Sequence, residues 1–340
     1  MVQLLGLVLI SFAVTGLLLV PFIDLLFYLR EKYRKSPARK LYEEIKRENT
    51  PIHDKLLIGK DTETPVGGGI LLIPIVVILS LFIINTIYKE INKEIYILVF
   101  TFISFGLIGF IDDIKKIFTV FTGKFIGLRA RYLLLLQIFF AGFVGFWLYS
   151  LGLNNIFIPI LGNIILGVWY IPLAVVVIIA FSNAYNIADG LDGLAAGLLT
   201  ICLFAFLALA HAAFNPTLSI FVGVWIGALI AFLYFNVFPA RIYLGDAGAF
   251  AFGATLALVG LLTGKIIGLA VIGGVYIIIV GSSLSQIISK RIFKKKIMAV
   301  APLHMYFKYI GWEEPKIVFR FWLAGSIFAI FGLFLALSSH

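Results

Sequence analysis

Long apolar runs alternate with short polar segments along the whole chain. A transmembrane helix needs about 20 predominantly apolar residues, and ten runs come close to that length. The first run is too long for a removable signal peptide and lacks a small-residue cleavage site, so we interpret it as the first membrane helix. The pattern predicts an all-α polytopic membrane protein with spans at residues 2–29, 66–88, 95–111, 132–151, 164–182, 194–213, 217–236, 248–263, 266–288 and 320–338.

The composition supports this pattern and argues against a soluble domain, because 62% of the 340 residues are hydrophobic and only 13% are charged. The length therefore reflects the number of helices, and the sequence shows no convincing internal repeat or separate soluble domain. We expect one membrane-embedded domain over residues 1–340. The single cysteine, Cys202, excludes an intramolecular disulfide and lies in an apolar run.

Positive charge is distributed unequally between the two sets of loops. Ten spans place both termini on one side, and every Lys or Arg of the 27 except Lys89, Lys93 and Lys265 falls in the loops of the other side. The positive-inside rule makes those loops cytoplasmic and both termini external, as expected for a multi-pass protein of the cell membrane. The predicted cytoplasmic segments are residues 30–65, 112–131, 183–193, 237–247 and 289–320.

The net charge of +10 does not indicate a nucleic-acid partner, because the cations are spread over membrane-flanking loops without a recognition fold. Such charges orient the protein in the membrane. They also attract anionic lipid headgroups or a phosphorylated substrate.

The stretch "NAYNIADGLDGLAAG" (183–197) places two amides and two carboxylates between apolar runs, where unpaired polar groups are costly. In an uninterrupted helix of about 100° per residue, Asn183 and Asp192 would face opposite sides. We therefore expect the nearby glycines to break the helix after Asp189 and a new helix to begin near Leu194. A capped turn between two helices is the alternative interpretation. The four candidate residues are Asn183, Asn186, Asp189 and Asp192.

Two further short segments on the predicted cytoplasmic side carry aspartates. "GFIDDIKK" holds Asp112 and Asp113, and "NVFPARIYLGDAGAF" holds Asn236 and Asp246. Each could be explained locally, as a solvated helix end or as a helix N-cap. Because the three segments lie on one side of the membrane, we expect them to converge into one acidic pocket at the bilayer surface.

The types of the candidate residues indicate which ion such a pocket would bind. Aspartates and amides without a cysteine cluster suit a hard, oxygen-seeking ion, Mg²⁺ or Mn²⁺, better than zinc. Mg²⁺ usually keeps bound waters and shares substrate phosphates, so it needs few protein ligands. This points to phosphoryl chemistry on a diphosphate.

These three segments resemble the signature segments of the polyprenyl-phosphate N-acetylhexosamine-1-phosphate transferases (glycosyltransferase family 4). Within that superfamily, "TPVGGGILL" and "APLHMYFKYIGWEEPKIVFRFW" are most similar to the phospho-N-acetylmuramoyl-pentapeptide transferases of peptidoglycan synthesis. The five segments occur in the expected order over about residues 60–330. The resemblance implies Mg²⁺, a cytoplasmic active site and a homodimer. It also implies transfer of a sugar-1-phosphate from a UDP-linked amino-sugar donor to a polyprenyl phosphate, with release of UMP and formation of a precursor such as lipid I.

The resemblance also implies roles for individual residues. Asp246 would contact Mg²⁺, together with Asp189, and His304 would approach the diphosphate. Asp112 and Asp113 would act on or near the lipid phosphate. The nucleotide and metal site would be lined by Lys116, Asn183, Asn186, Asp189, Asp192 and Asn236.

The sequence departs from the family pattern at Met305 and Tyr306, where histidines are expected, and at Leu133, where a lysine is expected. These changes leave open a different UDP-amino sugar for another glycan pathway, and they give some weight to an inactive relative. A cation-coupled transporter is the alternative from another class. It would require carboxylates near mid-bilayer and an internal repeat, and the sequence shows neither.

Overall fold

The computed structural model describes residues 2–34, 64–88, 93–122, 129–158 and 162–338. Ten helices in these ranges are long and apolar enough to cross a membrane, which confirms the predicted all-α polytopic architecture. They include α1 (Val2–Arg34), α4 (Gly68–Tyr88), α5 (Lys93–Thr122), α6 (Ala130–Ser150), α7 (Tyr170–Ala188), α8 (Leu194–Ala212), α9 (Pro216–Asn236), α10 (Gly245–Leu262), α12 (Gly274–Ile292) and α14 (Glu314–Leu337).

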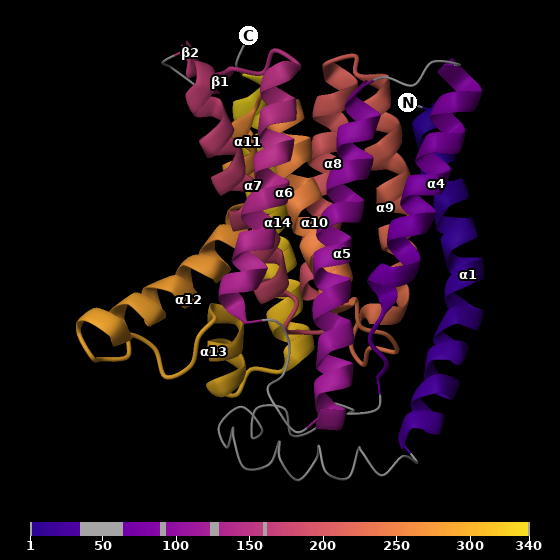
Figure 1. Cartoon of the computed structure of the whole chain (residues 1–340), viewed down its shortest axis with the longest axis vertical. Coiled ribbons are helices and arrows are strands. Elements are labelled where there is room, and N and C mark those ends of the chain that lie inside the picture. Colours follow the sequence, from indigo (N-terminus) through magenta and orange to yellow (C-terminus); the bar gives the residue numbers. More distant parts are fainter. Residues whose placement is uncertain (1, 35–63, 89–92, 123–128, 159–161, 339–340) are drawn as a thin grey trace.

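The beginning of α1 and the end of α14 lie at the same end of the bundle, as an even number of spans requires (Figure 1). The side of the membrane that this end faces stays a prediction. Most of the predicted cytoplasmic loop 30–65 lies outside the described residues.

Four short elements complete the described chain. An antiparallel hairpin of β1 (Asn155–Ile158) and β2 (Gly162–Ile165) precedes the 3₁₀ turn η1 (Gly167–Trp169), near the end of the bundle that carries the termini (Figure 1). The other two are the helices α11 (Ile266–Ile272) and α13 (Leu303–Tyr309). Strand structure among the described residues is thus confined to one surface hairpin.

Several predicted boundaries were wrong in the same way, because α1 continues past residue 29 to Arg34 and α14 begins at Glu314 instead of residue 320. Helix α5 continues past residue 111 to Thr122, and α7 continues past residue 182 to Ala188. Polar residues assigned to loops therefore sit on helices. Hydrogen bonds to other helices satisfy several of these side chains, so the helices continue through polar sequence that an apolar-run criterion excludes.

The predicted span 266–288 is interrupted. It consists of α11 and α12, which meet at Gly273. A side chain at Gly273 would overlap the ring of Phe181 on α7, so the break lies where the backbone packs tightly against a neighbouring helix. After the break α12 slants away from the bundle (Figure 1).

Helices α8, α9 and α10 form the centre of the bundle, because 72%, 78% and 83% of their most apolar windows are buried, against 17% for α1. An aromatic cluster connects the central helices to α5. The rings of Phe102 and Phe252 stack at 5.5 Å, and Trp225 packs edge-on against both. This rigid core supports the helix ends that carry the candidate residues.

Candidate active site

The predicted aspartate clusters meet toward the end of the bundle opposite the termini, where α7 ends and α8 and α10 begin, while α5 continues beyond this level (Figure 1). Helix α7 stops at Ala188, and α8 begins at Leu194. Gly193 adopts a φ of +75°, a left-handed conformation that glycine reaches without strain. The predicted break after Asp189 is therefore confirmed.

Asp113 holds the N-terminus of α10. Its two carboxylate oxygens accept hydrogen bonds from the backbone N–H groups of Asp246, at 3.3 Å, and Ala247, at 3.1 Å. The first N–H groups of a helix have no partner within it, and the helix dipole favours a negative charge at that end. Asp113 thus joins α5 to α10 and fixes the backbone that carries Asp246.

Glycine allows α5 and α10 to approach closely enough for this contact. A Cβ atom added at Gly109, one turn before Asp113, would overlap the carbonyl oxygen of Asp246. The two backbones are therefore in direct contact at the level of the candidate site.

Asn186 links α7 to the same point. Its side-chain amide donates a 3.0 Å hydrogen bond to Oδ1 of Asp246. Through Asp246, one set of hydrogen bonds connects α5, the C-terminal part of α7 and the beginning of α10. The expected convergence of the three sequence segments is observed in these contacts.

A cavity of about 180 Å³ opens beside this chain. It is lined by Asp189, Leu191, Asn236 and Tyr243. A volume of this size, on the order of six liquid waters, can hold a hydrated ion or a phosphate group. Asp189 therefore lines a space that is large enough for a phosphate group.

The segment "TPVGGG" fixes the loop that leads into α10. The backbone N–H groups of Gly67 and Gly68 both donate to the carbonyl of Tyr243, at 3.0 and 2.9 Å. The Thr64 hydroxyl donates to the carbonyl of Ala240 at 2.9 Å. In this structure the segment holds the cavity wall that contains Tyr243.

Asp192 and Asn236 connect backbone segments around the cavity. Oδ2 of Asp192 accepts a 3.0 Å hydrogen bond from the backbone N–H of Ala240. Oδ1 of Asn236 accepts from the N–H of Gly193, and its amide donates to the carbonyl of Ile242. Both side chains are almost fully buried. The alternative in which an aspartate caps α8 is wrong, because Gly193 occupies the N-cap and no side chain caps the helix.

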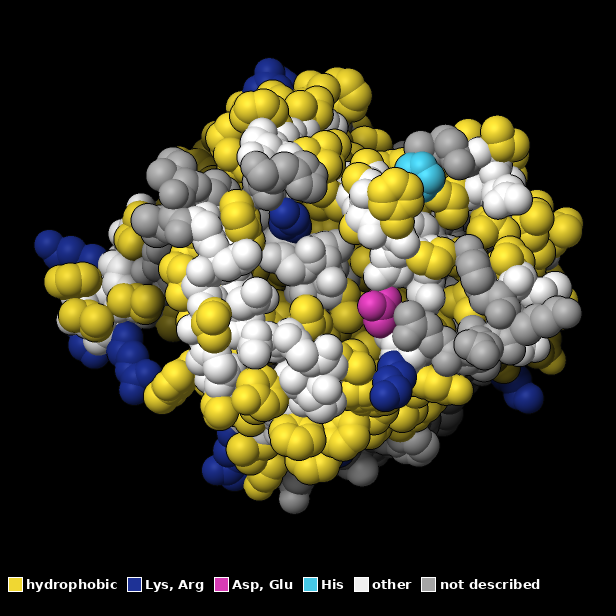
Figure 2. All heavy atoms as spheres, turned by 90° about the horizontal axis from the view of Figure 1, so that it is seen from above, with side chains coloured by type: hydrophobic (Ala, Val, Ile, Leu, Met, Phe, Trp, Pro, Cys, Tyr) yellow, Lys and Arg dark blue, Asp and Glu magenta, His cyan; other side chains and the backbone are white. Residues whose placement is uncertain are grey.

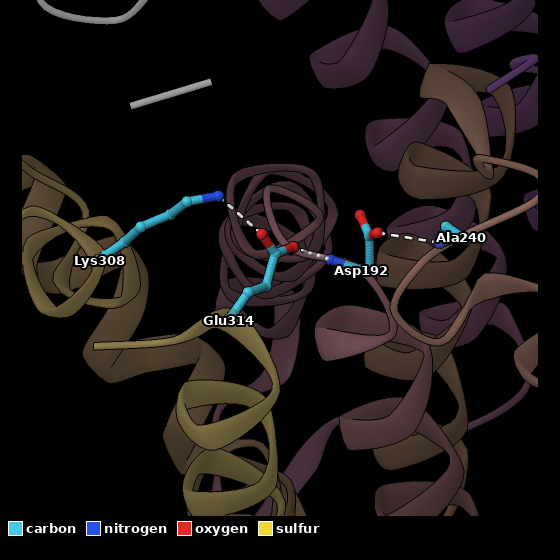
Figure 3. A network of polar contacts seen from close by, with 4 residues as sticks. All are labelled: Asp192, Ala240, Lys308 and Glu314. Atoms are coloured by element: carbon cyan, nitrogen blue, oxygen red, sulfur yellow. Dashed lines mark hydrogen bonds and ion pairs between the residues drawn. The ribbon is translucent and has the colours of Figure 1, made fainter. Parts of the chain in front are cut away.

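Glu314, at the start of α14, joins this loop to α13 (Figure 3). Its Oε1 accepts a 2.7 Å hydrogen bond from the backbone N–H of Asp192, and its Oε2 forms a 2.7 Å ion pair with Lys308. The Glu314 side chain is only 4% exposed. The sequence placed Glu314 within a matched segment but gave no reason to assign it a role, since an acidic residue in a first helical turn is common.

His304 lies in the first turn of α13 and is completely buried. A Cβ atom added at Gly190 would lie 2.8 Å from its Nε2, so the imidazole faces the loop between α7 and α8. His304 is therefore placed next to Gly190, the residue after Asp189, and its approach to the diphosphate stays a prediction. Met305 beside it is also largely buried.

The remaining predicted residues are less directly placed. Asp112 is buried on α5, next to Asp113 in the sequence. The amide of Asn183 donates to Oε1 of Gln137 and to the carbonyl of Ile179, both at 2.8 Å, which directs it into the helix bundle. The side chain of Lys116 lies outside the part of the chain that the structure describes.

The donor set fits the expected hard ion. In the described residues no group of three or more His, Cys, Asp and Glu is arranged to hold a metal. Mg²⁺, however, commonly takes one or two carboxylates and completes its octahedron with waters and substrate phosphates. Asp246, paired with an amide, and Asp189, at the cavity, are oxygen donors of that kind.

Comparison with known proteins agrees with the resemblance. Residues 95–264 match the model of glycosyl transferase family 4. The chain is 36% identical to a phospho-N-acetylmuramoyl-pentapeptide-transferase of Caldanaerobacter subterraneus over 82% of its length and 86% of the relative's. An enzyme of the same name from a Geobacillus species is 34% identical over 96% of both chains, and one from Borreliella afzelii is 36% identical over 86% of both.

Proposed function

The chain belongs to glycosyl transferase family 4, and from this premise we propose that it transfers phospho-N-acetylmuramoyl-pentapeptide from a UDP-linked donor to polyprenyl phosphate, releasing UMP. It is a multi-pass membrane transferase. Three relatives that cover most of the chain carry the name of this activity, which favours the pentapeptide donor over another UDP-amino sugar. The product is a lipid-linked cell-wall precursor of the lipid I type.

One observation carries the proposal. Asp246 accepts a hydrogen bond from Asn186 and donates one from its backbone N–H to Asp113, so three segments are joined at one end of the bundle, near a cavity that Asp189 lines. A lipid phosphate held at the membrane surface and a nucleotide sugar from the aqueous side can meet there. A transporter would instead need its polar groups near mid-bilayer.

The proposed reaction is a direct displacement. A phosphate oxygen of the lipid forms a bond to the sugar-bearing phosphorus of the donor, while the pyrophosphate P–O bond breaks and UMP leaves with the electron pair. Direct attack is favoured because the acceptor already carries an anionic oxygen. Asp246 and Asp189 would hold Mg²⁺, which would supply charge neutralisation for the two anionic substrates and the departing UMP.

We assign the remaining roles in the reaction to individual side chains of this protein. Following the resemblance, we assign the removal of the last proton of the lipid phosphate to Asp112, whereas Asp113 accepts hydrogen bonds from the backbone at the start of α10. Asn186 orients Asp246. His304 and Lys116 are assigned to the diphosphate, where positive charge or a donated hydrogen bond stabilises the transition state.

The proposal is tested with purified protein, polyprenyl phosphate and either UDP-N-acetylmuramoyl-pentapeptide or a peptide-free UDP-amino sugar. We expect release of UMP and formation of a lipid-linked product with the pentapeptide donor, and loss of both when Mg²⁺ is chelated. A reaction with the peptide-free donor alone would refute the donor assignment. An absence of UMP with every donor would refute the transferase activity.

A further inference from the structure

The C-terminal end of α12 and the loop after it display a dense group of cations. Lys290, Arg291, Lys294, Lys295 and Lys296 fall within seven consecutive residues, and all five are exposed. Residues 287–297 are called the basic arm below. In Figure 1, α12 carries this arm away from the bundle at the end where α13 lies.

Large apolar side chains are interspersed among these cations. Ile287, Ile292, Phe293 and Ile297 are between 60% and 69% exposed. A mixture of exposed cations and large apolar groups is typical of segments that lie in a membrane interface, with the apolar groups in the acyl boundary and the charges among the headgroups. In water the same apolar surface would be unfavourable.

The arm has a defined shape, which is held by buried polar side chains. Oε1 of Gln286 accepts hydrogen bonds from the N–H groups of Ile297 and Met298, at 2.9 and 3.1 Å, and its amide donates to the carbonyl of Met298 at 2.7 Å. The Ser289 hydroxyl donates to the carbonyl of Lys295 at 2.8 Å. Gln286 and Ser289 are themselves at least 92% buried. The chain is thus folded back on α12, and its cations are presented together.

The position of α12 brings the arm to the membrane surface. Gly274–Ile292 is long and apolar enough to cross a bilayer, yet only 28% of its most apolar window is buried in the protein. Lipid is therefore expected around most of the helix. Long basic side chains at the end of such a helix reach toward the headgroups.

We propose that the basic arm is a binding site for the headgroups of anionic phospholipids in the leaflet next to the candidate active site. Charge complementarity selects the occupant, because five cations within seven residues match a surface of lipid phosphates. The arm itself contains no acidic residue that would neutralise these cations. Each basic residue near such a surface is expected to raise the affinity by about fivefold. The proposal does not depend on the identity of the transferred sugar.

The test measures lipid composition at the arm itself. Phe293→Cys is labelled with a fluorophore, and the full chain is reconstituted in phosphatidylcholine vesicles. Cys202 is buried, so labelling of the unmodified chain gives the background. Quenching by nitroxide-labelled phosphatidylglycerol is then compared with quenching by nitroxide-labelled phosphatidylcholine. We expect the anionic lipid to be preferred, and expect this preference to weaken at high salt.

Two charge-matched variants locate the effect. Lys295→Gln with Lys296→Gln, made in the labelled chain, should lower the preference by about fivefold for each cation removed. Arg129→Gln with Arg131→Gln removes the same charge from exposed positions at the start of α6 and should leave the preference at Phe293 intact. Thermal unfolding of both variants checks that they fold.

Three results would overturn the proposal. The first is equal quenching by the two lipids. The second is an equal loss of preference in both double variants, which would indicate net charge rather than a local site. The third is protection from both quenchers with self-quenching between labelled copies, which would identify a second copy of the chain as the occupant.

Discussion

Glu314 accepts a 2.7 Å hydrogen bond from the backbone N–H of Asp192, which lies 122 residues earlier in the chain. The same carboxylate forms the ion pair with Lys308 on α13. The start of the last helix therefore holds both the loop that follows Asp189 and the helix that carries His304.

Replacing Glu314 with Gln should loosen this connection. The glutamine oxygen can still accept from the N–H of Asp192, but Lys308, whose side chain is 19% exposed, loses its charged partner. We expect a loss of about 1 to 3 kcal/mol in the free energy of unfolding and a lower kcat. Thermal unfolding in detergent and UMP release measure the two effects.

The exposed neighbour Glu313 offers the matched control, since Glu313→Gln makes the same chemical change without this network. Lys308→Met in the Glu314→Gln background should restore part of the stability, because it removes the unpaired cation. Equal effects of Glu313→Gln and Glu314→Gln would show that the network does not hold the site.

Gly109→Ala should separate α5 from α10. The added methyl group would overlap the backbone of Asp246, so the helices must move apart and the two bonds made by Asp113 must lengthen. Overpacking of this kind costs about 1 to 3 kcal/mol, and we expect most activity to be lost. Gly142→Ala on α6 is the control, because nothing lies within 4 Å of its added Cβ. Wild-type activity in Gly109→Ala would contradict the proposed close contact.

Asn183→Ala should affect stability more than substrate binding. The amide of Asn183 is engaged by Gln137 and Ile179 within the bundle, although its sequence position suggested the nucleotide site. We expect destabilisation by about 1 kcal/mol and a KM for the UDP-linked donor close to that of the unmodified enzyme. A large rise in this KM with unchanged stability would show that Asn183 contributes to binding of the nucleotide.

Asp112→Asn should produce a defect that depends on pH. The second pKa of a phosphate monoester is about 6, so the lipid acceptor carries a proton in acid and loses it without help in base. If Asp112 removes that proton, kcat/KM of the variant relative to the unmodified enzyme should be lowest below pH 6 and should recover above pH 8. A ratio that is constant over this range would exclude the proton-transfer role.

The apolar runs predicted the ten spans well, because a membrane helix is specified by length and local composition. They also placed the aspartates at one end of the bundle, since alternate loops must face the same side. The interruption at Gly273 was missed, although the consecutive glycines Gly273 and Gly274 are a local signal for a helix break.

The different roles of the residues within the site could not be predicted from the sequence. Asp192 and Asp189 look equivalent in "NIADGLDG", yet Asp192 bonds to the backbone of Ala240 whereas Asp189 lines the cavity. The reach of Glu314 to Asp192 likewise depends on the packing of α14 against α8. Such assignments require the tertiary contacts.

We propose that the three aspartate segments form one centre for phosphosugar transfer, with Asp246 at its middle. Mg²⁺-dependent UMP release is measured for Asp246→Asn and for the control Asp24→Asn on the exposed surface of α1, and thermal unfolding checks that both variants fold. We expect Asp246→Asn to fold and be inactive and Asp24→Asn to retain activity. A folded Asp246→Asn protein with unchanged UMP release would contradict this proposal.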